Sequence, residues 1–147
     1  MTPAAIPIDA ARPAPLWRRL AAMLYDLFPL LGLWMLTAGL WAWASGYDAR
    51  HPHPLARAGL QLLLLAVSAA YFLVSWIRIG QTIGMRAWRL RLVREDGGGL
   101  RAGRAFARFL LALLSLAIAG CGFWYAWFDP GQRTLHDRLC GTRMIRL

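Results

Sequence analysis

The sequence predicts an all-α integral membrane protein, a helical bundle built from three hydrophobic segments. Hydrophobic residues make up 59% of the 147 residues, above the roughly 45–50% of ordinary globular chains. No charged residue occurs in residues 27–47, 59–77 or 109–128, and about 20 such residues are what a helix needs to cross a bilayer. A soluble chain of this length would have too little polar surface to cover all three segments.

The segments divide the chain in order. Residues 1–15 are rich in Pro and Ala, so we expect a disordered tail before a membrane domain at 16–147. Trp41 and Trp43 close the first segment, and Trp76 closes the second; aromatic residues of this kind favour the headgroup level. We therefore expect membrane spans at about 20–44, 59–79 and 106–128.

A small pair of strands is expected outside the spans. Apolar and arginine side chains alternate over residues 87–94, a period of two that indicates a strand. Three glycines, 97–99, then provide a turn. The closing residues, TRMIRL, also read as a strand, and their evident partner is 87–94. This pairing of the central basic loop with the C-terminal tail requires both on one side of the membrane.

That requirement conflicts with three single crossings, which would place the tail opposite the N-terminus. Arginines concentrate before the first span, in the central loop and in the tail, so the positive-inside rule favours a cytoplasmic location for all three. The residues GCG at 120–122 could split the third segment into two short helices that enter and return. Its length nevertheless fits one ordinary span, and the side on which the tail lies stays open.

The charge distribution and the sequence motifs argue against several classes of protein. The net charge of +10 comes from 17 arginines against seven acids; their position between spans suggests anionic lipid headgroups as partner, not nucleic acid. Cys121 and Cys140 lack a CxxC pattern. His51 and His53 in HPHP could bind a metal, but an exposed Pro-rich loop fits better. Because catalytic and phosphate-binding motifs are absent from the sequence, we expect no enzyme, cofactor or metal.

Asp26 directly precedes the first uncharged stretch, and Arg19 precedes Asp26 by seven residues. On a helix the two would lie within ~20° of one face and ~10.5 Å apart along the axis. An ionised acid within the membrane costs at least ~2.5 kcal/mol. Asp26 could therefore lie at the interface if the span starts at Leu27, pair with a base, or form a ligand or proton site.

Five sequence pieces occur in order: RLAAMLYD, GQTIGMR, WRLRLV followed by EDGGG, Arg108, and RTLHDRLCGT. With them, residues 16–147 resemble the RDD family of membrane proteins, named for one arginine and two aspartates; Met85 departs from it, since a basic residue is commoner there. The resemblance implies a triad of Arg19, Asp26 and Asp137, as ion pairs or as a ligand or proton site. Its supporting residues are Arg78, Arg86, Arg108, His136, Gly80 and Thr82.

If the tail is cytoplasmic, we expect Asp137 to reach Arg19, and Asp26 to pair with Arg78, Arg86 or Arg108. The resemblance also suggests transport. We expect a small transporter of a cation, a proton or a small solute, acting as a homo-oligomer or with another membrane protein. The alternative is a structural or adaptor membrane protein without transport. The expected location is the bacterial cytoplasmic (inner) membrane, multi-pass, with a cytoplasmic N-terminus.

Overall fold

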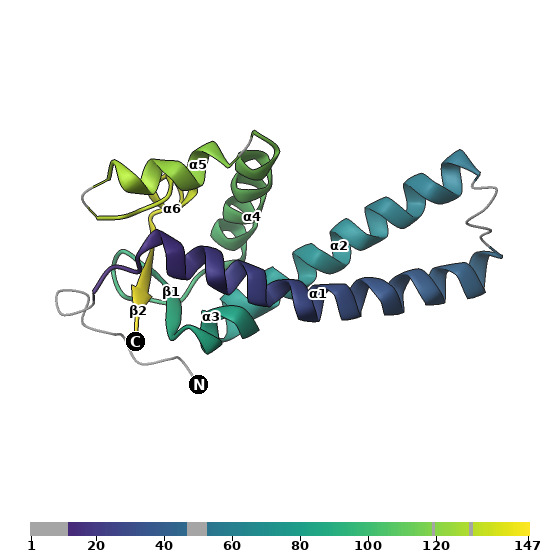
Figure 1. Cartoon of the computed structure of the whole chain (residues 1–147), viewed down its shortest axis with the longest axis horizontal. Coiled ribbons are helices and arrows are strands. Elements are labelled where there is room, and N and C mark those ends of the chain that lie inside the picture. The colour runs from purple at the N-terminus through teal and green to yellow at the C-terminus, as the bar shows by residue number, and fades with distance from the viewer. Residues whose placement is uncertain (1–11, 47–52, 119, 130) are drawn as a thin grey trace.

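The computed structural model describes residues 12–46, 53–118, 120–129 and 131–147. Most of the expected N-terminal tail, and His51 of the HPHP loop, lie outside these residues. The chain is mostly helical, with one small sheet (Figure 1). Its elements in order are α1 (Leu16–Ser45), α2 (Pro54–Arg78), α3 (Ile83–Ala87), β1 (Leu90–Arg94), α4 (Ala102–Ala117), α5 (Cys121–Trp124), the 3-10 turn η2 (Tyr125–Trp127), α6 (Leu135–Leu139) and β2 (Thr142–Arg146).

Helices α1 and α2 form an antiparallel hairpin that extends away from the other elements (Figure 1). Their 30 and 25 residues correspond to about 45 and 37 Å, more than the ~30 Å of a hydrocarbon core. The indole Nε1 of Trp34 donates to Oγ of Ser68 at 2.8 Å and joins the two helices. Large apolar side chains such as Phe28 and Met35 are exposed along the hairpin. Within the described residues these two helices are long and apolar enough to cross a membrane.

The third hydrophobic segment differs from the expected span at 106–128. Helix α4 has 16 residues, about 24 Å, and ends before Ile118. Gly120 follows with a positive φ of 74°, a conformation that suits a residue without Cβ. The backbone N–H of Gly122 then donates to Oγ of Ser115 at 2.9 Å, so the chain turns back against α4. Within the described residues the third segment is therefore not one uninterrupted helix, and it is divided into α4 and α5 where the GCG sequence begins.

The predicted strand pair is present. Strands β1 and β2 are antiparallel, with Leu90 opposite Arg146 and Leu92 opposite Met144. Leu90 and Leu92 face the interior, where both are almost fully buried. Pro13 adds an isolated bridge to Ile145 of β2. The start of α1, the central loop and the tail therefore meet at one end of the molecule, called the head end below.

The hydrophobic core lies at this head end. Leu90 and Leu92 of β1 pack there with Trp76 from the end of α2 and Phe109 from α4. Met85 of α3 completes the contact between the short helix and the core. The far half of the hairpin contributes nothing to this cluster, so the buried polar residues described next are all positioned by the head end.

Candidate functional site: a buried arginine–aspartate cluster

Asp137 lies between two arginines from different helices. Its Oδ2 accepts from Nη1 of Arg19 in α1 at 2.7 Å, and its Oδ1 accepts from Nη2 of Arg108 in α4 at 2.6 Å. Asp137 in α6 is 0% exposed and both arginines are 3% exposed. Three elements far apart in the sequence therefore converge on one carboxylate.

The position of Asp137 is fixed by the start of α6. Thr134 is the N-cap, and the two residues form a capping box. In this arrangement the Asp137 carboxylate accepts from the Thr134 backbone N–H at 3.4 Å, which satisfies an amide that the short helix leaves unpaired. The hydroxyl of Thr142 adds a contact to Oδ1 at 3.4 Å. Contacts within the α6 capping box and from Thr142 thus help to orient the carboxylate toward the two arginines.

Each arginine has a second contact that holds its guanidinium. Arg19 Nε donates to the carbonyl oxygen of Ala14 at 3.0 Å. The Arg108 guanidinium carbon lies 4.9 Å from the centroid of the Trp76 ring, within the range of a cation–π contact. Among the described residues, Arg19 Nη2 and Arg108 Nε have no hydrogen-bond partner. Each guanidinium is therefore held by Asp137 and by a second contact, although one of its N–H donors makes no hydrogen bond.

The charge states follow from burial and from the neighbours. Burial raises the pKa of Asp137, but the positive charges of Arg108 and Arg19 outweigh this effect and lower the pKa to about 2. Burial, with repulsion from Arg108, lowers the pKa of His136 to about 3. Asp137 is therefore ionised at neutral pH and His136 is neutral. The ring nitrogen Nε2 of His136 lies 2.9 Å from Oγ1 of Thr134.

A second group of charges lies beside the cluster. Arg133 Nη1 bonds Glu95 at 2.7 Å, and its Nε lies 3.3 Å from Asp129 Oδ2. The negative charge of Asp129 also acts on Arg19. These bridges add two carboxylates and one guanidinium to the two guanidiniums and one carboxylate around Asp137. The two groups together therefore contain three positive and three negative charges.

Asp26 occupies a different site, on the same face of α1 but further along the helix. Its carboxylate accepts three hydrogen bonds, all from uncharged donors: the Tyr71 hydroxyl at 2.7 Å, the Thr82 hydroxyl at 2.5 Å and the Gly84 N–H at 2.8 Å. Its side chain is only 2% exposed. Arg19 and Asp26 thus share a helix face, but they bind different partners, and the triad does not form one cluster.

The expected pairing of Asp26 with an arginine is wrong for the described residues. No arginine there forms an ion pair with it, because Arg108 bonds Asp137 instead and both Arg78 and Arg86 are exposed. Burial also argues against an Asp26 that simply faces water at the interface. The carboxylate instead lies over the first turn of α3, where the Thr82 side chain caps the helix.

Glycines fix the approach of α3 to α1. A Cβ at Gly84 would lie 2.0 Å from the backbone oxygen of Ala22, so another residue here would separate the two helices. Gly80 has a positive φ of 73° and its carbonyl accepts from the Leu92 N–H at 2.8 Å, which places β1 beside the end of α2. The sequence pieces identify both glycines, but not their partners.

Sequence reasoning missed Tyr71 and Gly84 as Asp26 partners. Tyr71 lies in the middle of the second hydrophobic segment, where its phenol would otherwise lack a partner in hydrocarbon. That requirement is the signal that could have identified it. The Gly84 amide carries no comparable signal, because backbone donors are common to all residues.

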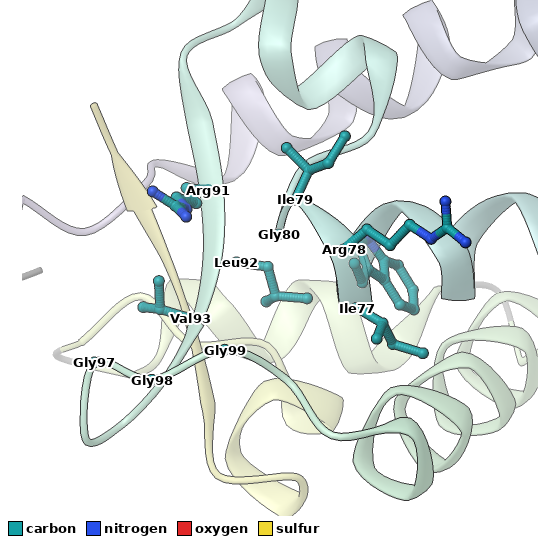
Figure 2. A pocket seen from close by; sticks show the side chains of 11 residues that line it. Ile77, Arg78, Ile79, Gly80, Arg91, Leu92, Val93, Gly97, Gly98 and Gly99 are labelled. Atoms are coloured by element: carbon teal, nitrogen blue, oxygen red, sulfur yellow. The ribbon is translucent and has the colours of Figure 1, made fainter. Parts of the chain in front are cut away.

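Neither of the two described cavities is lined by Asp26 or Asp137. A small pocket of about 20 Å³ lies between the end of α2, β1 and the glycine turn, with room for about one water molecule. Figure 2 shows Leu92 directed toward the end of α2, with the Arg78 guanidinium pointing away from β1. A wider hollow of about 520 Å³ lies between the β1 turn, α4 and the turn before β2. Among the described residues no His, Cys, Asp or Glu cluster suits a metal, and His53 is exposed.

Two long, exposed apolar helices joined to a head end with buried arginine–aspartate pairs point to a small helical membrane protein. The sequence model of the RDD family matches residues 13–141. The chain belongs to the RDD family.

One curated relative gives little further information. The protein named "Uncharacterized protein YxaI" from Bacillus subtilis (strain 168) is 28% identical over 85 residues. The alignment covers 57% of this chain, and 56% of the relative's own length. No solved structure matches. The comparisons therefore identify a family without assigning it an activity.

Proposed function

We propose that this RDD-family protein is an integral membrane protein that moves a cation or a proton by means of Asp26. The supporting observation is a buried carboxylate with no positively charged partner among the described residues. Ionisable groups within membrane helices are costly to retain, so they generally mark ion or proton paths. Asp26 combines that cost with an uncompensated charge.

The surroundings of Asp26 suit either cargo. Protonation would remove its charge, and the hydroxyls of Tyr71 and Thr82 can rotate to donate or accept. A small alkali cation would instead find a carboxylate and two hydroxyl oxygens, and hard cations prefer such oxygen ligands. A larger solute has less support, because the three donors occupy the space around the carboxylate.

A transport path requires more membrane-spanning helices than one copy of the chain supplies. Two spanning helices cannot enclose a route through the bilayer, so we propose a homo-oligomer or an assembly with another membrane protein. The location proposed is the bacterial inner membrane, multi-pass, with the N-terminus and head end in the cytoplasm. Exposed arginines at the head end, such as Arg86 and Arg101, would face anionic headgroups there. No enzymatic activity and no nucleic-acid partner are proposed.

A structural or adaptor role is the second candidate. It is favoured by the Arg19–Asp137–Arg108 cluster, which is closed to solvent and joins α1, α4 and α6. Such a cluster maintains one arrangement of the head end, and buried ion pairs often serve specificity more than stability. In this role the head end would present a surface to a partner, and no substrate would cross.

Flux measurements distinguish the two functions. Purified protein in liposomes is given a proton or alkali-cation gradient; a trapped pH dye reports proton movement, and a trapped cation-sensitive dye reports alkali-cation movement. We expect flux from the native chain, loss of flux in Asp26→Asn, and retention in the matched control Asp96→Asn, whose side chain is largely exposed. Absence of flux from well-folded native protein would remove the transporter and leave the adaptor.

A further inference from the structure

Helix α4 has an inverted distribution of polar and apolar side chains. Its buried face includes Arg108 and Ser115, together with Ala105 and Phe109. A surface helix of a soluble protein places its polar residues outward. Beyond Arg104, the large side chains that α4 and the residue after it expose are instead apolar: Phe106, Leu110, Leu113, Leu114, Leu116 and Ile118.

This apolar surface continues beyond the turn at Gly120. Trp124, Trp127 and Phe128 of the following segment are all exposed. The rings of Trp124 and Trp127 pack with centroids 4.8 Å apart. Tryptophan is enriched where a protein meets the boundary between headgroups and acyl chains. The exposed side chains of α4, α5, η2 and Phe128 form what we call the α4–η2 surface.

The direction of α4 argues against a third span parallel to α1. Figure 1 shows α4 running across the direction of α1 and not along it. Its start lies at the head end, because Arg108 shares Asp137 with Arg19. The chain after α4 returns to the same end, because α6 carries Asp137 and β2 pairs with β1. The segment therefore begins and ends at one level of the molecule.

Charge complements the apolar surface at its edge. Arg101 and Arg104 stand exposed at the start of α4, where the apolar face begins. Basic side chains beside an apolar helical face are typical of helices that lie in the membrane interface, and the cytoplasmic leaflet carries anionic lipid. Helix α4 also packs against α2, whose exposed side chains include large apolar ones such as Leu62 and Val74.

We infer that the α4–η2 surface lies within a single lipid leaflet, in the plane of the membrane at the head end, and is not part of a third crossing. This inference rests on the proposed insertion of α1 and α2. The occupant is the leaflet itself, with acyl chains against α4 and headgroups at Arg101 and Arg104. It places the N-terminus and the tail on one side of the membrane, as the arginine distribution favours.

Spin-label depth measurements test the inference. In a chain with Cys121 and Cys140 replaced by Ala, one label is attached at a time to Leu110→Cys, Leu114→Cys or Met35→Cys. Each protein is reconstituted in vesicles containing anionic lipid, and label accessibility to oxygen and to a water-soluble nickel complex is compared. We expect the label at 35 to be deepest, and those at 110 and 114 to be lipid-exposed at similar, shallower depths.

Three other results of the depth measurements would each contradict a different part of the argument. A depth that increases from 110 to 114, until the label at 114 lies as deep as the label at 35, would show a third span and overturn the inference. Nickel-accessible labels at 110 and 114, with a deep label at 35, would overturn it while leaving α1 inserted. A nickel-accessible label at 35 would instead contradict the proposed membrane insertion.

A second measurement avoids the cysteine replacements. The Trp127→Phe variant of the otherwise native chain is compared with the native protein in vesicles of brominated lipid. The fluorescence component lost in the variant should be quenched more by bromine near the headgroup than by bromine near the chain end. Equal absence of quenching at both depths would contradict a lipid location for Trp127.

Discussion

Arg19 and Asp137 form a buried ion pair, 2.7 Å from Nη1 to Oδ2, although 118 residues separate them in the chain. The pair brings the first residues of α1 to the C-terminal α6, and Arg108 adds α4 to the same carboxylate. Because these charged groups are buried away from water, each relies on the opposite charge beside it to offset the cost of its burial. The cluster is therefore the point at which single substitutions should have the greatest effect on the head end.

Asp137→Asn should be strongly destabilising. It leaves two buried guanidiniums without their counter-charge, and breaking a buried pair in this way costs about 3–5 kcal/mol. We expect a large drop in the denaturant midpoint of the detergent-solubilised protein. Asp96→Asn, on an exposed turn, serves as the control and should change it little. Equal midpoints for the two variants would contradict the central role of Asp137.

Stability should fall as the pH is lowered below about 6.5. The folded protein holds the pKa of His136 at about 3, whereas an unfolded histidine titrates near 6.5. The unfolded state therefore binds an extra proton between these values, and stability present above pH 6.5 is lost toward pH 3. Down to pH 4 the loss should be on the order of 3 kcal/mol. Unfolding midpoints measured from pH 8 to 4 check this, and His136→Gln should flatten the dependence.

A further loss is expected in stronger acid. The pKa of Asp137 is about 2 in the folded state, below the ordinary aspartate value of about 3.9. Its contribution is therefore fully present above that ordinary value, and it disappears as the pH falls through about 2. A stability curve of His136→Gln that shows no decrease below pH 4 would contradict the contribution of Asp137.

Gly84→Ala should disrupt the contact between α1 and α3. The added Cβ would lie 2.0 Å from the Ala22 carbonyl oxygen and 2.9 Å from Cγ of Asp26, and forced overpacking typically costs 1–3 kcal/mol. Gly39→Ala is the matched control, because its Cβ would meet nothing within 4 Å and alanine favours helix. Thermal unfolding should show loss in the first variant only; comparable loss in both would refute the steric argument.

Tyr71→Phe tests whether Asp26 needs its neutral donors. The change removes the hydroxyl that donates to Oδ1 at 2.7 Å, and hydrogen bonds to charged groups contribute about 1.5–3 kcal/mol. We expect a loss of that size in unfolding measurements, with the fold retained. Tyr25→Phe, on an exposed part of α1, should have little effect. An unchanged stability in Tyr71→Phe would mean that water or another group replaces the hydroxyl.

Local patterns were sufficient for the elements that depend on neighbouring residues. Uncharged length predicted the two long helices, and alternation over 87–94 predicted the strand that pairs with the tail. The family resemblance, together with charge counting, favoured Asp137 as a partner of Arg19, and the two do meet. Whether the triad serves transport remains a prediction.

The partners of Asp26 were beyond such reasoning. Charge counting favoured an arginine, but three uncharged groups from α2, Thr82 and α3 provide the hydrogen bonds. Hydrophobic length likewise could not decide between a third span and a turn at Gly120. Both answers depend on how distant segments pack.

The sequence by itself determined that two helices would seek an apolar environment and that a basic strand would pair with the tail, because hydropathy and alternation act over a few residues. Tertiary structure alone decided which carboxylate meets which donor, and that α4 lies across the hairpin. The physical reason is that hydrogen bonds and ion pairs act over about 3 Å, so they form only after packing has brought their groups together.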